Sequence, residues 1–230
     1  MTPGLANKLS SKYAAKICCN FPETVANIPN GKGILTGTPI RKELLSGDKV
    51  AGLNLCGFNT EKPVLMIIGG SLGALHVNEA IRRIIPELIR RYQVIHICGK
   101  EKIDNLLLTT KGYKQFEYVK SELKDLFAMA DLVISRAGAN AICELLALKK
   151  PNILIPLKAG SRGDQILNAN SFKKQGYSEV LEEENMTNDN LLDAINKLYE
   201  NREKYIETMC SSKLNDSTNI IVDLINKVCK

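Results

Sequence analysis

From residue 60 onward, short apolar runs rich in β-branched residues alternate with stretches of helical period. The runs are VLMII (64–68), QVIHI (93–97), FEYV (116–119), LVIS (132–135), NILIP (152–156) and SEVL (178–181). Uninterrupted apolar strands separated by helices are typical of a parallel sheet that is covered on both faces. The sequence therefore predicts an α/β fold with a doubly wound, Rossmann-like parallel sheet, in which ligands bind at the carboxyl ends of the strands.

The stretches between these runs carry helix signals at particular residues. Residues 76–92 predict an amphipathic helix that Pro86 bends or ends. Ser121 is the predicted N-cap of a helix over 121–130. Another helix is predicted to begin near Asp164 and to stop at Gly176, a glycine in the position that follows a helix end.

The two ends of the chain depart from this alternation. Residues 1–35 predict a helix, one short strand and a turn, which cannot close a core alone, and residues 36–60 predict a linker with a short helical turn after Arg41. After Thr187 come three helical patterns. The last of them has an apolar face that must pack on another part of the protein, formed by Ile221, Leu224, Ile225 and Val228. We expect one domain over 61–230 that includes these C-terminal helices.

Composition narrows the classes of function. No apolar run approaches the length of a membrane span, and the N-terminus has no signal-peptide pattern. The seven cysteines show no metal-ligand spacing, so we expect reduced core thiols and no metal site. The net charge of +6 fits either a solvated basic surface or contact with an anionic membrane surface. We do not expect nucleic-acid binding, because aromatic residues are only 5% and no basic run is interleaved with them.

The first of three strand-to-helix turns is IIGGSLGALHV. Gly69 and Gly70 follow a buried strand, and Ser71 with the first N–H groups of the next helix could bind a phosphate. A plain βα turn is the alternative. A nicotinamide-cofactor site is disfavoured, because the next strand ends in HICGK, without the acid that would hold a ribose.

The second and third turns carry polar side chains. In ISRAGANAICE, Glu144 follows Gly138 by about one and a half helical turns, where it could meet a ribose or merely complement the helix dipole. In IPLKAGSRGDQ, Asp164 and Gln165 could hydrogen-bond sugar hydroxyls, or Asp164 could be a simple N-cap. Together the turns outline a site for a nucleotide-diphosphate sugar. His96, in the middle of a strand, is interpreted as a core residue with satisfied hydrogen bonds rather than as a catalytic one.

Four motifs in this order and spacing, TGTPIR, GGSLGA, SRAGANAICEL and RGDQILNA, resemble the MurG family of peripheral membrane N-acetylglucosaminyltransferases. The resemblance runs essentially end to end and implies the C-terminal half of a B-type glycosyltransferase architecture. In that family the N-terminal domain carries the acceptor site and a GGTGGH-type loop. The His of this loop is a candidate base. Nothing in this chain matches that loop. We therefore expect 1–35 to be a remnant of the acceptor domain, in a fragment or one half of a split gene.

The resemblance also implies which residues contact the donor: Arg41, Ser71, Lys120, Ala139, Asn140, Ala141, Glu144, Asp164 and Gln165. Arg41 would lie at the interdomain hinge, Ser71 and the turn over 139–141 would bind the diphosphate, and the backbone at Lys120 would read the uracil edge. Glu144 would hold the ribose hydroxyls. The pair at 164–165 would hold the GlcNAc hydroxyls.

The implied reaction is transfer of GlcNAc from UDP-GlcNAc to lipid I, giving lipid II of peptidoglycan synthesis, at the cytoplasmic face of the cell membrane. The C4 hydroxyl of the acceptor would attack GlcNAc C1 with inversion, without a cofactor. Catalytic residues are expected in the N-terminal domain, so the chain should be inactive alone. Two alternatives stay open. One is a non-catalytic nucleotide-sugar-binding subunit of a split lipid-linked transferase, and the other is a UDP-sugar epimerase on the same architecture.

Overall fold

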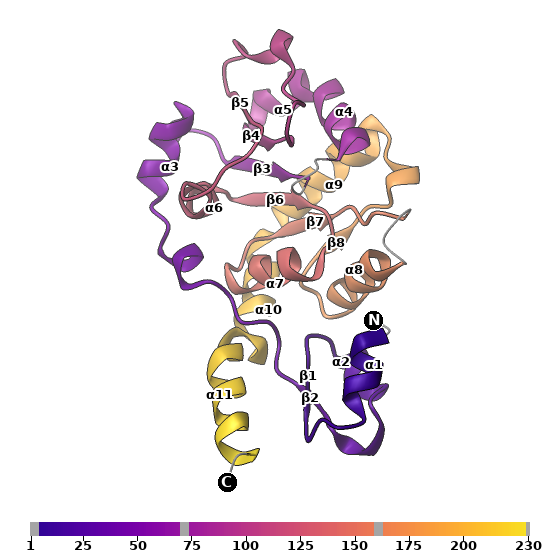
Figure 1. The fold of residues 1–230 in the computed structure, drawn as a ribbon. Helices are drawn as coiled ribbons and strands as arrows, with labels where there is room; N and C mark the ends of the chain where they lie inside the picture. Colours follow the sequence, from indigo (N-terminus) through magenta and orange to yellow (C-terminus); the bar gives the residue numbers. More distant parts are fainter. Residues whose placement is uncertain (1–4, 70–73, 159–162, 229–230) are drawn as a thin grey trace.

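The computed structural model describes residues 5–69, 74–158 and 163–228 (Figure 1). Its main sheet has six strands: β3 (Val64–Ile68), β4 (Gln93–Ile97), β5 (Tyr113–Phe116), β6 (Leu132–Ser135), β7 (Asn152–Leu154) and β8 (Glu179–Val180). Their order is β5-β4-β3-β6-β7-β8, and every neighbouring pair is parallel. The predicted doubly wound parallel sheet is confirmed.

Side chains alternate along each strand, so the apolar strands present apolar side chains on both faces of the sheet. Helices cover both of these faces. Met66 and Val133 face a cluster with α6 (Leu123–Met129), α7 (Ala139–Ala147) and α8 (Asp164–Lys174). Leu65 and Ile134 face a second cluster with α4 (Leu75–Arg83), α5 (Ile85–Arg91) and α9 (Asn188–Glu200). The carboxyl ends of the strands are thereby left as the edge at which loops can form a site.

Most local signals lie where they were predicted. Pro86 occupies the start of α5, which follows α4 after a break at Ile84, and Gly176, with φ of 75°, follows the end of α8. Two predictions were wrong. Ser121 is not an N-cap, since α6 begins after Glu122 without a side-chain cap. The run at 116–119 is not the edge strand, which instead spans Tyr113–Phe116.

Residues 1–35 contain more structure than one strand. They form α1 (Leu5–Ser11), β1 (Ile17–Cys19), α2 (Pro22–Ala26) and β2 (Gly33–Leu35). β1 and β2 pair in parallel, so the prediction of a single strand is wrong. This small unit contacts α8: the ring of Phe21 meets that of Phe172 edge to face with centroids 6.1 Å apart. The Ser171 hydroxyl donates to the Glu23 carboxylate at 2.9 Å.

The segment 36–60 includes the expected helical turn, η2 (Lys42–Ser46), and an unexpected helix, α3 (Lys49–Cys56). The Asp48 side chain caps α3 by accepting from the N–H of Val50 at 2.7 Å. α3 packs closely on α6, and the Asp48 N–H donates to Asp125 at 2.7 Å. The division into domains at 35 and 60 stays a prediction.

Replacing Gly52 of α3 by Ala should destabilise the fold by about 1–3 kcal/mol, although Ala is the better helix former. A Cβ at this buried position would lie 2.4 Å from the backbone carbonyl oxygen of Asp125. Urea denaturation measures the effect. Asn54→Ala, on the exposed side of the same helix, is the control for helix propensity. A Gly52→Ala variant at least as stable as the wild type would contradict this packing.

The C-terminal part consists of α9, α10 (Arg202–Cys210) and α11 (Ser217–Val228), as the three helical patterns predicted. α11 extends away from the main sheet (Figure 1). Of its predicted apolar face, Ile221 and Leu224 are half-buried whereas Ile225 and Val228 are exposed, so within the described residues this face packs only in part. At the start of α11, the Ser217 hydroxyl lies against Gly37, which has a φ of 71°. None of the described helices is long and apolar enough to cross a membrane.

His96 is a buried core residue, as predicted. The Asn78 amide nitrogen donates to the Cys98 carbonyl at 2.8 Å, which directs its oxygen toward His96 Nε2 at 2.9 Å. Nε2 therefore carries the proton, and Nδ1 accepts from the Tyr113 hydroxyl at 2.8 Å. Burial lowers the pKa of His96 to about 3, so the ring stays neutral.

Candidate functional site

Besides the short α6, three described helices begin at the carboxyl edge of the sheet without a side-chain cap. They are α4 after β3, α7 after β6 and α8 after β7, and their N-cap residues are Ala74, Gly138 and Gly163. In contrast, side chains of Asp48 and Thr187 cap α3 and α9. An uncapped helix start presents N–H donors and the positive end of the dipole to a ligand. Such starts bind phosphate groups in many proteins.

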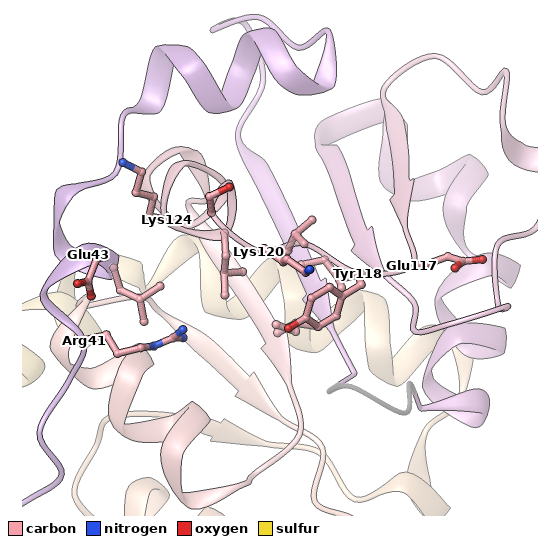
Figure 2. Close-up of a pocket in the computed structure, with 12 residues that line it drawn as sticks. Arg41, Glu43, Glu117, Tyr118, Lys120 and Lys124 are labelled. Atoms are coloured by element: carbon pink, nitrogen blue, oxygen red, sulfur yellow. The ribbon is translucent and has the colours of Figure 1, made fainter.

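A cavity of about 510 Å³ lies where β3, β4 and β5 end, facing the segment 41–44 (Figure 2). In Figure 2, Arg41 extends from this segment toward the side of the cavity that holds the ring of Tyr118. The remaining wall comes from the strand ends Ile68 and Ile97 and from residues 117–121, 123 and 124. The cavity thus combines apolar surface, an exposed aromatic ring and basic side chains.

Lys120 lines this cavity, as the predicted contact to a base requires. Its backbone N–H donates to the carboxylate of Glu122 at 3.2 Å, and its carbonyl accepts from the Leu123 N–H at 3.3 Å. Backbone hydrogen bonds from Glu122 itself and from Lys120 lower the pKa of the Glu122 carboxyl. A ligand that used the Lys120 N–H would have to replace this exposed carboxylate.

The structure brings together two predicted site residues that are far apart in the sequence. A guanidinium nitrogen of Arg41 lies 3.2 Å from a carboxylate oxygen of Glu144 on α7. Arg41 is 64% exposed and Glu144 21% exposed, so this pair contributes about 0–1 kcal/mol to stability. The contact uses one guanidinium nitrogen and one carboxylate oxygen. Both side chains can therefore rearrange around a ligand at little cost.

A second cavity, of about 750 Å³, separates the N-terminal unit from the starts of α7 and α8. Ala139, Asp164 and Asn168 form one wall, and residues from α1 to α2 form the other. Asn140 and Ala141 lie in the first turn of α7, with Asn140 exposed. Ala139 of the predicted diphosphate turn and Asp164 of the predicted sugar contacts therefore border this cavity, whereas Arg41 and Lys120 border the first.

The other two predicted site residues are Gln165, which is not among the described residues that line the two cavities, and Ser71. The Gln165 side-chain oxygen accepts from the Leu157 N–H at 3.0 Å, which ties the start of α8 to the loop after β7. In this conformation Gln165 offers a ligand its amide NH₂ group. Ser71 lies outside the described residues.

Sequence reasoning missed Tyr118 and Glu183. Tyr118 is an exposed aromatic residue at the carboxyl end of an edge strand, a signal that was available but was assigned to the strand itself. Glu183 lies outside every motif and forms an ion pair with Arg136, whose hydrogen bond lowers the pKa of this carboxyl. No local pattern indicates that contact.

Two cysteines, Cys18 and Cys19, line the second cavity. Cys19, Cys56, Cys98 and Cys143 are buried free thiols. Cys18 and Cys210 are exposed, so the prediction of core positions was wrong for these two. In the described part of the chain, no group of His, Cys, Asp and Glu side chains is arranged to hold a metal ion.

Comparison with known proteins identifies relatives along the whole chain. Residues 64–224 match the glycosyltransferase family 28 C-terminal domain. A protein of Lachnospira eligens is 61% identical over 98% of this chain, and one of Clostridium botulinum strain Kyoto is 55% identical over 100%. Both are named UDP-N-acetylglucosamine--N-acetylmuramyl-(pentapeptide) pyrophosphoryl-undecaprenol N-acetylglucosamine transferase. The chain spans 64% and 65% of their lengths.

Solved structures share the fold. MurG of Acinetobacter baumannii superposes with a TM-score of 0.76 at 23% identity, over 97% of this chain and 64% of that one. The UDP-GlcNAc 2-epimerase of Neisseria meningitidis, bound to UDP-GlcNAc, superposes with a TM-score of 0.68 at 14% identity, over 96% of this chain and 63% of that one. At these identities the likeness establishes the architecture alone, which is the one predicted from the sequence.

Proposed function

Because this chain belongs to glycosyltransferase family 28, we propose that it is the donor-binding part of an enzyme that transfers GlcNAc from UDP-GlcNAc to lipid I. The names of relatives at 61% and 55% identity support this activity, although the chain spans about 64% of their length. The observation that carries the proposal is the contact between Arg41 and Glu144. It joins a cavity at the carboxyl edge of the sheet to a helix with an uncapped start.

We assign the uridine to the cavity of about 510 Å³. The base would stack on Tyr118 and take the Lys120 N–H from Glu122, since an exposed aromatic ring gains from stacking on a base. The ribose hydroxyls would donate to Glu144, whose partner Arg41 can turn toward the diphosphate. This arrangement places the sugar-phosphate end of the donor toward α7.

We assign the diphosphate to the first N–H groups of α7, at Ala139, Asn140 and Ala141, with Ser71 as a further predicted contact. The GlcNAc would then lie near Asp164 and the NH₂ group of Gln165, beside the second cavity. Negative charge develops on UDP as the C4 hydroxyl of the acceptor attacks GlcNAc C1. Helix N–H groups and Arg41 would stabilise that charge.

We propose further that the enzyme works at the cytoplasmic face of the cell membrane, as a peripheral protein. The acceptor in the names of the relatives is linked to undecaprenol, a lipid, so transfer has to take place at a membrane surface. The net charge of +6 favours attraction to anionic lipids. The catalytic base is expected in the part of the relatives that precedes the matched region.

Calorimetry with a panel of nucleotides tests this function. UDP and UDP-GlcNAc should bind at least about tenfold more tightly than GDP-mannose and NAD, because all four carry a diphosphate but only the first two carry the uracil edge that the Lys120 backbone is assigned to read. UDP-GalNAc, which differs at one sugar hydroxyl, should fall between the two groups. Tighter binding of NAD than of UDP would exclude the proposal.

The epimerase alternative predicts the same donor, so binding alone does not separate it. Its support is the shared fold with a UDP-GlcNAc 2-epimerase, at 14% identity. Incubation of UDP-GlcNAc with the chain and the separately supplied N-terminal third of the Lachnospira eligens relative, followed by proton NMR, distinguishes the two. The proposed transferase leaves the sugar configuration at C2 unchanged, whereas an epimerase would give the manno isomer.

A further inference from the structure

Glu183 in the short helix η4 (Glu183–Asn185) is contacted by basic side chains from two separate turns. Arg136 binds it with both terminal nitrogens, Nη1 to Oε2 at 2.7 Å and Nη2 to Oε1 at 3.2 Å. His76 Nδ1 lies 2.9 Å from Oε1. Arg136 and Glu183 are 13% and 17% exposed, so this bidentate pair is largely withdrawn from water.

The partners of Glu183 come from the elements that begin the proposed site. His76 is the second residue of α4, and Arg136 directly precedes the turn at Ala137 and Gly138 that starts α7. Arg136 Nη1 also donates to the carbonyl of Ile155 at the end of β7, at 3.1 Å. One carboxylate thus connects the starts of α4 and α7 and, through Arg136, the strand that leads to α8.

The direction of Arg136 follows from these contacts. Although Arg136 lies just before the predicted diphosphate turn, its guanidinium is bound to Glu183 and to the Ile155 carbonyl. On the other side of the turn, the Asn168 amide of α8 donates to the Ala137 carbonyl at 3.0 Å. The turn is therefore held from both sides, and its N–H groups stay available for a ligand.

We propose that Glu183 is a positioning residue for diphosphate binding, which fixes the starts of α4 and α7 relative to each other so that their N–H groups converge on one anion. This inference rests on the proposed function. Convergent donors bind an anion well only if they are held in place before it arrives. A buried ion pair often adds little net stability, so its geometric effect is the main consequence of Glu183.

The test compares UDP with uridine on the 230-residue chain. Glu183→Gln keeps the side-chain size but replaces one acceptor oxygen by a donor that faces Arg136. UDP should bind about tenfold more weakly, on the scale of one lost hydrogen bond to a charged group. Uridine, which has no phosphate and is followed by NMR titration, should bind as it does to the wild type. A role in general stability would weaken both ligands alike.

Two further variants complete the design. Glu184→Gln is the matched control, because Glu184 is an exposed neighbour that pairs with Lys158 on the surface at 2.8 Å, and its UDP affinity should not change. His76→Ala, at a 73% exposed position, should fold and weaken UDP binding about threefold through the loss of one contact. If it leaves UDP binding unchanged, or if Glu183→Gln weakens UDP and uridine equally, the inference is wrong. Wild-type chain that binds no UDP would instead overturn the proposed function.

Discussion

The 230-residue chain, assayed alone with UDP-GlcNAc and lipid I, should bind the donor and transfer no N-acetylglucosamine. Transfer requires the acceptor hydroxyl to be held within attack distance of GlcNAc C1, and such positioning accounts for about 7–11 kcal/mol of a barrier. The chain spans 64% of the relatives that carry this activity in their names. We assign the acceptor wall and the base to the remaining part of those proteins.

A radiolabelled transfer assay measures this loss, with the full-length Lachnospira eligens relative as the positive control. The N-terminal third of that relative, supplied as a separate chain, should restore part of the activity. Such restoration would also show how a two-chain enzyme could operate, which is the split-subunit alternative. Turnover by the 230-residue chain at the rate of the full-length relative would contradict the assignment of roles.

Replacing Glu144 by Ala should weaken UDP binding by roughly 1–3 kcal/mol, which is about 5- to 150-fold in Kd. The ribose hydroxyls would lose the carboxylate that accepts their hydrogen bonds, and Arg41 would lose the partner that holds it beside the cavity. The melting temperature without ligand should change little, because Arg41 is 64% exposed and surface ion pairs stabilise weakly.

Calorimetry with UDP measures this effect, and differential scanning measures the stability. Glu87→Ala is the matched control, since it removes an exposed carboxylate from α5, away from both cavities. Unchanged UDP affinity in Glu144→Ala would remove Glu144 from the site. A large drop in melting temperature would show that its role is structural.

The central strands were predictable because their residues are apolar throughout, as in VLMII of β3, which is buried on both faces. The edge strand β5 was not, because its sequence YKQF places one exposed Lys and one buried Gln among its four residues. Gln115 is satisfied by the backbone of Asp104, at 3.0 and 2.9 Å, which a polar residue alone does not reveal. β2 is too short to show a pattern, and α3 contains Gly52, which packing rather than helix propensity explains.

The candidate site also contains some features that were predictable from the sequence and others that were not. Turns such as the one before α7 were predicted because small residues follow a buried strand within a few positions. The Arg41–Glu144 pair joins residues 103 positions apart, and only the resemblance to known enzymes suggested that both lie by one ligand. Glu183 contacts residues 47 and 107 positions away and has no motif of its own. Such contacts depend on the folded arrangement of loops and cannot be read from local sequence.

The position of β3 in the sheet has a consequence for how the chain folds while it is being synthesised. β3 is the first strand of the main sheet to leave the ribosome, yet it lies at the centre. Leu65 pairs with Leu132 of β6, which is made 67 residues later, about 3–13 s at ordinary rates of elongation. During that interval one edge of an entirely apolar strand has no neighbour, which favours association between nascent chains. The arrival of β6 closes this edge, so the pace of translation between β4 and β6 should influence how much protein folds.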